Sequence, residues 1–309
     1  RLNLPRQTKS MGGALARIAK CLLVVLAFAS SSSFADAQTG QSLPSPSGSF
    51  GQYRETVTDL RVKSLGGYLS VERTWRGPEN GWLFFPKWEE RFAMGAAEAD
   101  GHPDVIRHGS VRYVRMPGSE QPEWRSADRT IEYADGRYRW QDTDGGWMEF
   151  DGLGRVLGIG SRYLTMGTVR RDAGGRLVGL IDANDLEVIT IERDAEGDVF
   201  RATDYAGREV LYGVVDGRLT TVTDVRGYPW GYSYDENGRL RTKTNPNGRV
   251  TTISYSEDGL LHSIFDQDGF GAEYRYDHDA ATGLNYEWVQ SNDGLVTEMW
   301  KRGGVVVRR

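Results

Sequence analysis

The sequence predicts an all-β fold, in which a long antiparallel ribbon of tandem repeats forms a curled sheet and follows a small β module. Glycine-centred turns recur at a nearly constant interval through residues 148–309. Between them, apolar and polar residues alternate, as they do in strands with one buried face. The 39 glycines and 9 tryptophans suit many short strands joined by tight turns. A single long sheet of this kind must curl or close to protect its edges.

One glycine marks each unit of the array and is usually followed by Arg or an apolar residue. Its positions are 21, 22, 20, 21, 21 and 24 residues apart, at Gly154, Gly175, Gly197, Gly217, Gly238, Gly259 and Gly283. A second glycine recurs midway between them, at Gly207, Gly227, Gly248 and Gly269. A fixed period in this range is typical of stacked or coiled repeats. Each unit therefore reads as strand, turn, strand, turn.

The residues around the first glycine form a motif whose chemistry suits a strand reversal. An Asp that opens the turn accepts hydrogen bonds from backbone N–H groups two or three residues on. Gly supplies a positive φ, an aromatic residue before the turn packs across the strand pair, and the Arg after Gly can reach a neighbouring Asp. Besides the glycines, we assign to this motif Asp151, Arg155, Asp172, Arg176, Asp194, Asp216, Arg218, Tyr234, Asp235, Arg239, Tyr255, Tyr276 and Asp277.

Residues 1–37 have the pattern of a secretory signal. From Met11, which we expect to be the true start with residues 1–10 upstream of it, Arg17 and Lys20 precede an apolar run and a small-residue exit. We expect cleavage between Ala37 and Gln38. The mature chain would then be exported to the cell surface or the medium, with the periplasm as a third destination. Residues 38–53 are rich in Ser, Gly and Pro and read as a flexible linker.

Residues 54–147 form the predicted N-terminal β module. Two alternating runs, 59–64 and 68–75, flank Gly66 and Gly67 and predict a hairpin. Three clustered tryptophans follow, and they fit either core packing or a face that stacks on sugars: Trp75, Trp82 and Trp88. The core interpretation is the more common one for such residues.

Composition excludes several functions. The only cysteine, Cys21, lies in the predicted signal, so the mature chain has no disulfide or thiol nucleophile. The formal net charge is −5 and no basic patch is present, which argues against nucleic acid as a partner. No catalytic, cofactor or metal motif occurs, so we expect no enzyme, cofactor or metal. We read the paired carboxylates as turn caps, at Asp142, Asp144, Asp266 and Asp268, and expect surface positions for His102 and His108.

The motif resembles the YD repeat of RHS (rearrangement hotspot) proteins. Tyr234-Asp235, followed by Gly238-Arg239-Leu240, looks like its signature, and the period and the midway half-motif agree. Residues 59–75 also look like the segment that precedes the array in secreted RHS proteins. The resemblance covers residues 54–309. It implies a β-ribbon wound into a cocoon-like shell, of the kind found in polymorphic toxins and teneurins.

The resemblance also implies a function and partners. In that family the shell encloses or delivers a C-terminal toxin or effector, or serves adhesion and intercellular competition. This chain has about seven repeats and lacks the Asp-Pro-x-Gly-Leu segment and variable domain that end the family's core. We therefore expect a truncated N-terminal part, whose partners are further repeats and a C-terminal effector. The alternative is a secreted module that binds carbohydrate or a cell surface, with cell-surface glycans as partners. A hydrolase is the third hypothesis, but nothing singles out two carboxylates for it.

Overall fold

The computed structural model describes residues 50–98, 100–119, 121–302 and 305–308. All regular secondary structure in these segments is β-strand. Within the same segments, no helix has the length and apolar character that crossing a membrane requires. The predicted signal, its cleavage site at Ala37 and Gln38, and residues 38–49 of the predicted linker lie outside the described residues.

A three-stranded sheet opens the described chain. Strands β1 (Glu55–Ser64) and β2 (Gly67–Trp75) form the antiparallel hairpin expected from the Gly66-Gly67 turn, and β3 (Trp82–Phe84) pairs with β2. The apolar residues of the two long strands alternate with polar ones. Their buried members are Leu60, Val62, Leu69 and Val71. One face of this small sheet is therefore covered by other parts of the chain.

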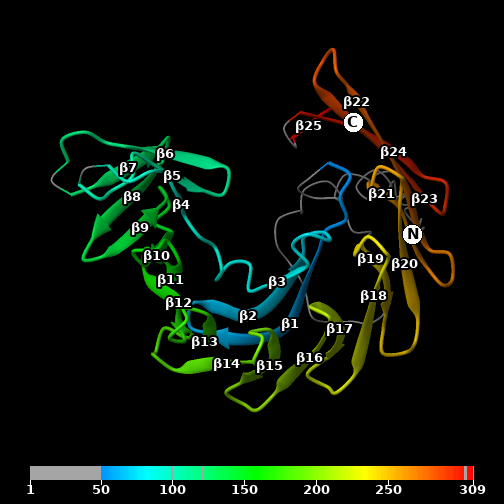
Figure 1. Cartoon of the computed structure of the whole chain (residues 1–309), viewed down its shortest axis with the longest axis horizontal. Coiled ribbons are helices and arrows are strands. Elements are labelled where there is room, and N and C mark those ends of the chain that lie inside the picture. Colours follow the sequence, from blue (N-terminus) through cyan, green and yellow to red (C-terminus); the bar gives the residue numbers. More distant parts are fainter. Residues whose placement is uncertain (1–49, 99, 120, 303–304, 309) are drawn as a thin grey trace, which may run out of the picture. The chain divides into compact units, whose positions relative to one another are not determined.

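The other strands form one sheet in which each strand pairs antiparallel with the next along the chain (Figure 1). Its first part consists of β4 (Ala93–Met94), β5 (Val105–His108), β6 (Val111–Arg115), β7 (Glu123–Ser126), β8 (Arg129–Ala134), β9 (Arg137–Gln141), β10 (Trp147–Phe150), β11 (Val156–Ser161), β12 (Leu164–Arg171) and β13 (Leu177–Ile181). It continues with β14 (Glu187–Arg193), β15 (Val199–Asp204), β16 (Glu209–Val215), β17 (Arg218–Thr223), β18 (Pro229–Tyr234) and β19 (Leu240–Thr244). It ends with β20 (Val250–Tyr255), β21 (Leu261–Asp266), β22 (Gly271–Asp279), β23 (Leu284–Ser291), β24 (Val296–Arg302) and β25 (Val305–Arg308).

The predicted all-β fold, with one long antiparallel sheet after a small β unit, is confirmed. No strand ladder joins β25 to β4 within the described residues, so this 22-stranded sheet is open there. Strands of both predicted segments, 54–147 and 148–309, belong to the sheet, since β9 pairs with β10. The boundary between the module and the array stays a prediction.

The turns on the two sides of the ribbon differ. In six successive units, the hairpin that contains the motif glycine has a register shift beside its turn, as between Ser233 and Tyr234. The midway hairpins β15–β16, β17–β18, β19–β20 and β21–β22 have none. A β-bulge bends its strand and increases local twist. From β14 to β22 the sheet therefore receives one such distortion per unit on the same side, whereas the earlier midway hairpins β11–β12 and β13–β14 have a register shift as well.

A row of buried aliphatic residues marks the start of the strand after each motif turn. Each member is at most 4% exposed: Val156, Leu177, Val199, Leu219, Leu240 and Leu261. Full burial of such a side chain contributes about 1.5–3 kcal/mol. The repeat therefore places one apolar anchor in the core at every period.

The surface positions expected for two histidines are wrong. His108 lies at the end of β5, its side chain is 15% exposed, and its ring packs edge-on against Phe92, Trp140 and Phe150. Its Nε2 lies 2.8 Å from a carboxylate oxygen of Glu90. The ring of His102 is also half-buried. Both histidines have polar residues nearby in the sequence, which suggested surface positions. The aromatic residues that pack against His108 lie elsewhere in the sequence, so the local pattern did not indicate this cluster.

Candidate functional site

Residues 50–92, which we call the N-terminal strip, lie against the large sheet and contact strands that are distant in the sequence. At its beginning, the ring of Phe50 meets that of Tyr276 in β22 edge-on, with the centroids 5.3 Å apart. The carbonyl oxygen of Gly51 accepts a 2.7 Å hydrogen bond from the N–H of Leu261 in β21. The strip therefore begins beside the later strands of the array.

The strip ends beside the first strand of the array. The ring of Phe92 stacks on that of Phe150 in β10, with centroids 3.8 Å apart. Its N–H donates a 3.0 Å hydrogen bond to the carbonyl oxygen of Gly154. In Figure 1, β1 and β2 pass beside the middle strands between these ends, where β1 contacts β15 and β16 and β2 contacts β12. The strip thus begins beside the late strands and ends beside the early ones, and between them the β1–β2 hairpin reaches β12 and returns to β18.

A buried polar network ties the middle of the strip to the sheet. Arg73 Nε donates a 2.8 Å hydrogen bond to Asp59, and its Nη2 donates a 2.6 Å bond to the hydroxyl of Tyr232 in β18. The hydroxyl of Tyr212 in β16 donates a 3.0 Å bond to the same oxygen of Asp59. Asp59 and Arg73 are 8% and 1% exposed, so this ion pair lies in the core. Beside it, Lys243 Nζ lies 2.7 Å from Glu55.

The electrostatics of this network favour a charged Arg73. Burial alone would lower the pKa of its guanidinium, but the Asp59 carboxylate outweighs that effect and raises the pKa. Burial raises the pKa of Asp59, and the guanidinium opposes this shift. Burial also raises the pKa of Tyr232, to about 12, so its hydroxyl keeps its proton. Arg73 Nη1 has no hydrogen-bond acceptor among the described residues, although the guanidinium lies 4.3 Å from the ring centre of Trp82.

The tryptophans of the strip belong to this core. Trp75 is 2% and Trp88 5% exposed, and Trp82 packs partly buried between Trp75 and Tyr232. They therefore present no coplanar face to a sugar, and core packing is their role. Two tryptophans of the array are half-buried. Trp230 packs against the core, and Trp288 lies under the guanidinium of Arg275 at 4.3 Å.

The motif turns show one recurring geometry, which the Tyr234 unit illustrates. Asp235 Oδ1 accepts hydrogen bonds from the N–H groups of Asn237 and Arg239, and Oδ2 lies 2.7 Å from the Nε of Arg239. Burial alone would raise the pKa of Asp235, but these hydrogen bonds outweigh it and lower the pKa. Gly238 has a φ of 75°, which suits glycine. The same arrangement recurs at Asp151 with Gly154 and Arg155, and at Asp172 with Gly175 and Arg176.

Other units depart from this geometry. Asp194 caps its turn through Oδ1 without an arginine partner, and Ser256 takes the place of Asp beside Tyr255 and Gly259. Asp216 and Gly217, with φ of 50° and 70°, form a two-residue turn whose flanking pair is Val215 and Arg218. That turn is a type I′ hairpin, which explains the shortened unit.

The assignment of Asp277 to the motif is wrong. Strand β22 continues to Asp279, whose Oδ1 accepts the N–H of Ala281 and whose carbonyl accepts the N–H of Gly283. The insertion lengthens the strand by one pleat, so the aspartate two residues later opens the turn. The spacing of 24 residues was the signal that could have located it.

The residue that precedes the motif turn forms a second recurring contact in four of the units. The hydroxyls of Tyr234 and Tyr255 donate to the carbonyl oxygens of Leu219 and Leu240, 15 residues earlier. In two units arginine stands at this position and makes the equivalent contact. Arg171 Nη2 donates to Val156 at 3.1 Å, and Arg193 Nε donates to Leu177 at 3.2 Å. In these four units the position carries a long hydrogen-bond donor that links adjacent units, whereas Phe150 and Val215 hold it in two others.

One carboxylate of each predicted pair acts as a turn cap, whereas Asp268 forms an ion pair with Arg249. Asp142 accepts the N–H of Gly146, and Asp266 accepts the N–H groups of Asp268 and Phe270. Over the part of the chain that the structure describes, no group of three or more His, Cys, Asp or Glu side chains could hold a metal ion.

Comparison with known proteins gives similarity at two levels. Residues 215–251 match the family model of the RHS repeat. Among solved structures, 77% of the chain aligns with 14% of a chain in the Photorhabdus luminescens Tc holotoxin pore, at 14% identity and a TM-score of 0.37. The TcdB2–TccC3 structure aligns over 76% of this chain and 15% of that one, at 14% identity and a TM-score of 0.29.

A third structure, TcdB2–TccC3 without its hypervariable C-terminal region, aligns over 80% of this chain and 19% of that one, at 10% identity and a TM-score of 0.32. The chain thus spans less than a fifth of these three chains. No curated protein matches it. The family match covers the units that contain the turns at Asp216 and at Asp235. Residues 215–251 therefore carry an RHS repeat, which confirms the resemblance seen in the sequence around Tyr234.

Proposed function

We propose that this chain is a structural part of a secreted RHS-repeat shell that encloses or delivers an effector carried further along the same polypeptide. Its partners in this role are additional repeats and that effector, and its place of action is outside the cell, in intercellular competition. The chain itself performs no catalysis in this proposal.

The N-terminal strip is the observation that carries the proposal. It contacts strands from β10 to β22, so that the repeats are held by their own hairpins and also by a second layer. A hydrogen-bond ladder alone leaves a long sheet free to twist. A packed second layer with a buried ion pair restricts that freedom, because each contact fixes one unit relative to the strip. A rigid wall is what an enclosing shell requires.

Limited proteolysis of the full-length protein tests the proposal. The gene is sequenced beyond the codon for Arg309, and the whole protein is expressed and treated with a non-specific protease. We expect the downstream segment to survive in the whole protein and to be degraded when it is expressed alone. Equal degradation in both contexts, or a stop codon directly after Arg309, would overturn the proposal.

A further inference from the structure

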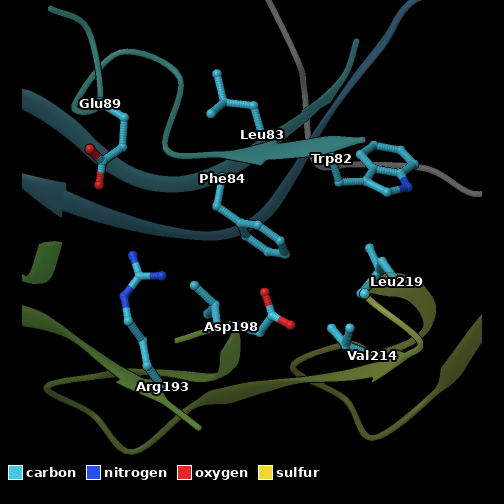
Figure 2. A pocket seen from close by; sticks show the side chains of 10 residues that line it. Trp82, Leu83, Phe84, Glu89, Arg193, Asp198, Val214 and Leu219 are labelled. Carbon is cyan, nitrogen blue, oxygen red and sulfur yellow. The ribbon is translucent and has the colours of Figure 1, made fainter. Parts of the chain in front are cut away.

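A cavity of about 280 Å³ lies between β3 and the strands β14 to β17. Its apolar walls are the side chains of Trp82, Leu83, Phe84, Val199, Val214 and Leu219. Gly217 and three charged residues complete the lining, and the charged residues are Glu89, Arg193 and Asp198. Figure 2 shows the guanidinium of Arg193 extending from β14 toward the strip, with Phe84 and Trp82 on the opposite wall. The cavity thus combines one arginine with an aromatic pocket.

Arg193 can be compared with an arginine at the equivalent position of the preceding unit. Arg171 holds the same position one unit earlier, before the motif Asp, and donates to the equivalent carbonyl oxygen. It also has a carboxylate partner, since its Nη1 lies 3.4 Å from Glu89. Arg193 donates to the carbonyl oxygens of Leu177 and Gly197, but it forms no ion pair with any described residue. Its Nη2 has no acceptor in the described part of the chain.

The electrostatic surroundings agree with this difference. Burial lowers the pKa of Arg193, and the attraction of Glu89 and of the nearby aspartates only partly opposes this effect. A partly buried cation with an unused pair of N–H donors gains from a carboxylate, because charge-assisted hydrogen bonds are roughly twice as strong as neutral ones.

We propose that this cavity binds a carboxylate on an apolar, aromatic-sized body, with the carboxylate on Arg193 and the body between Trp82 and Phe84. Glu89 and Asp198 lie in the same lining and repel negative charge, so the cavity favours a monoanion over a phosphate dianion. The volume is close to the lower end of small-molecule sites, which limits the ligand to about one aromatic ring with a short acid chain. This site is independent of the proposed shell function.

Calorimetric titration with matched probes tests the site. We expect phenylacetate to bind, and phenylacetamide and inorganic phosphate to bind at least about tenfold more weakly, a difference of about 1.4 kcal/mol. Arg193→Gln keeps donors for the two carbonyl oxygens and should lose phenylacetate binding by a similar factor, whereas Arg193→Lys should retain part of it. Arg226→Gln, at an exposed turn, is the matched control and should bind as the parent does. Unchanged thermal unfolding of the variants shows that the fold is retained.

Two results would overturn the site: phenylacetamide binding as tightly as phenylacetate, or undiminished binding by Arg193→Gln. Absence of phenylacetate binding at millimolar concentration would do the same. A short peptide that ends in a phenylalanine carboxylate distinguishes the sources of the ligand. Tighter binding than phenylacetate assigns the site to a polypeptide C-terminus, and weaker binding assigns it to a free small molecule.

Discussion

The hydroxyl of Tyr234 donates a 2.6 Å hydrogen bond to the carbonyl oxygen of Leu219, one strand pair away. The same hydroxyl accepts a 3.1 Å bond from Trp82 Nε1 of the strip. One oxygen therefore joins two adjacent repeats and the second layer that crosses them. Arg171 and Arg193 make the equivalent contact, so a guanidinium can replace the phenol at this position.

Tyr234→Phe should lower the free energy of unfolding by about 1–3 kcal/mol, because it leaves the carbonyl of Leu219 and the indole N–H of Trp82 without partners. Urea unfolding followed by far-ultraviolet circular dichroism measures the change. Tyr228→Phe is the matched control, since that ring is 52% exposed, and it should have no measurable effect. Equal effects of the two substitutions would show that the Tyr234 hydroxyl has no special role.

Asp59→Asn should destabilise the fold by about 3–5 kcal/mol, because it leaves the buried Arg73 charge without its carboxylate. The double variant Asp59→Asn with Arg73→Met removes the orphaned charge and should cost less than the sum of the two single variants. Thermal and urea unfolding of all four proteins complete the cycle. Strict additivity would mean that the two side chains do not interact.

Raising the pH should destabilise the folded chain between about pH 10 and pH 12. Burial raises the pKa of Tyr232 and of Tyr274 from 10.0 to about 12 in each case. In that window the unfolded chain loses phenolic protons that the folded chain keeps, so unfolding becomes more favourable. Below pH 10 this contribution to stability is fully present.

The free energy of unfolding measured across that window, together with tyrosinate absorbance, checks this prediction. The double variant Tyr232→Phe with Tyr274→Phe lacks the two phenolic protons whose loss links stability to pH. Its stability should therefore fall less steeply with pH than that of the parent. A slope that the double variant leaves unchanged would contradict the assignment.

Gly227→Ala should cost roughly 1–2 kcal/mol, since φ at this turn is 82° and a Cβ there is strained even though no atom lies within 4 Å. Gly231→Ala is the control four residues on, within β18. Its Cβ would meet Thr244 at an ordinary 3.5 Å, so the change should be neutral or stabilising by up to about 1 kcal/mol. Differential scanning calorimetry of both variants decides whether backbone conformation accounts for the cost.

The fold of the array could be predicted because its determinants are local. The spacing from Gly154 to Gly259 fixes where strands reverse, and alternation fixes which residues face the core. The hairpin at Gly66 and Gly67 follows from the same rules. The motif assignment was wrong where an insertion shifts the turn along the chain, since Asp279 and not Asp277 opens the last turn.

The candidate site could not be predicted in the same way. Asp59 meets Tyr212, and Arg73 meets Tyr232, across 153 and 159 residues. The repeat period and the alternation of apolar and polar residues describe local structure, so they do not predict contacts between a hairpin and strands so much later in the chain. Arg193 belongs to no motif assigned from the sequence, and only the position of β3 reveals the cavity that it lines.

The strip has a consequence for how the molecule is made. Ribosomes synthesise Phe50 before any strand of the array, yet its partner Tyr276 follows 226 residues later. Contacts of such long sequence separation slow folding. Because synthesis proceeds from the N-terminus, the domain cannot complete its fold until its last strands have been synthesised. The apolar side chains of β1 and β2 therefore stay uncovered until β16 and its successors emerge. During that interval the exposed apolar surface favours aggregation of the nascent chain.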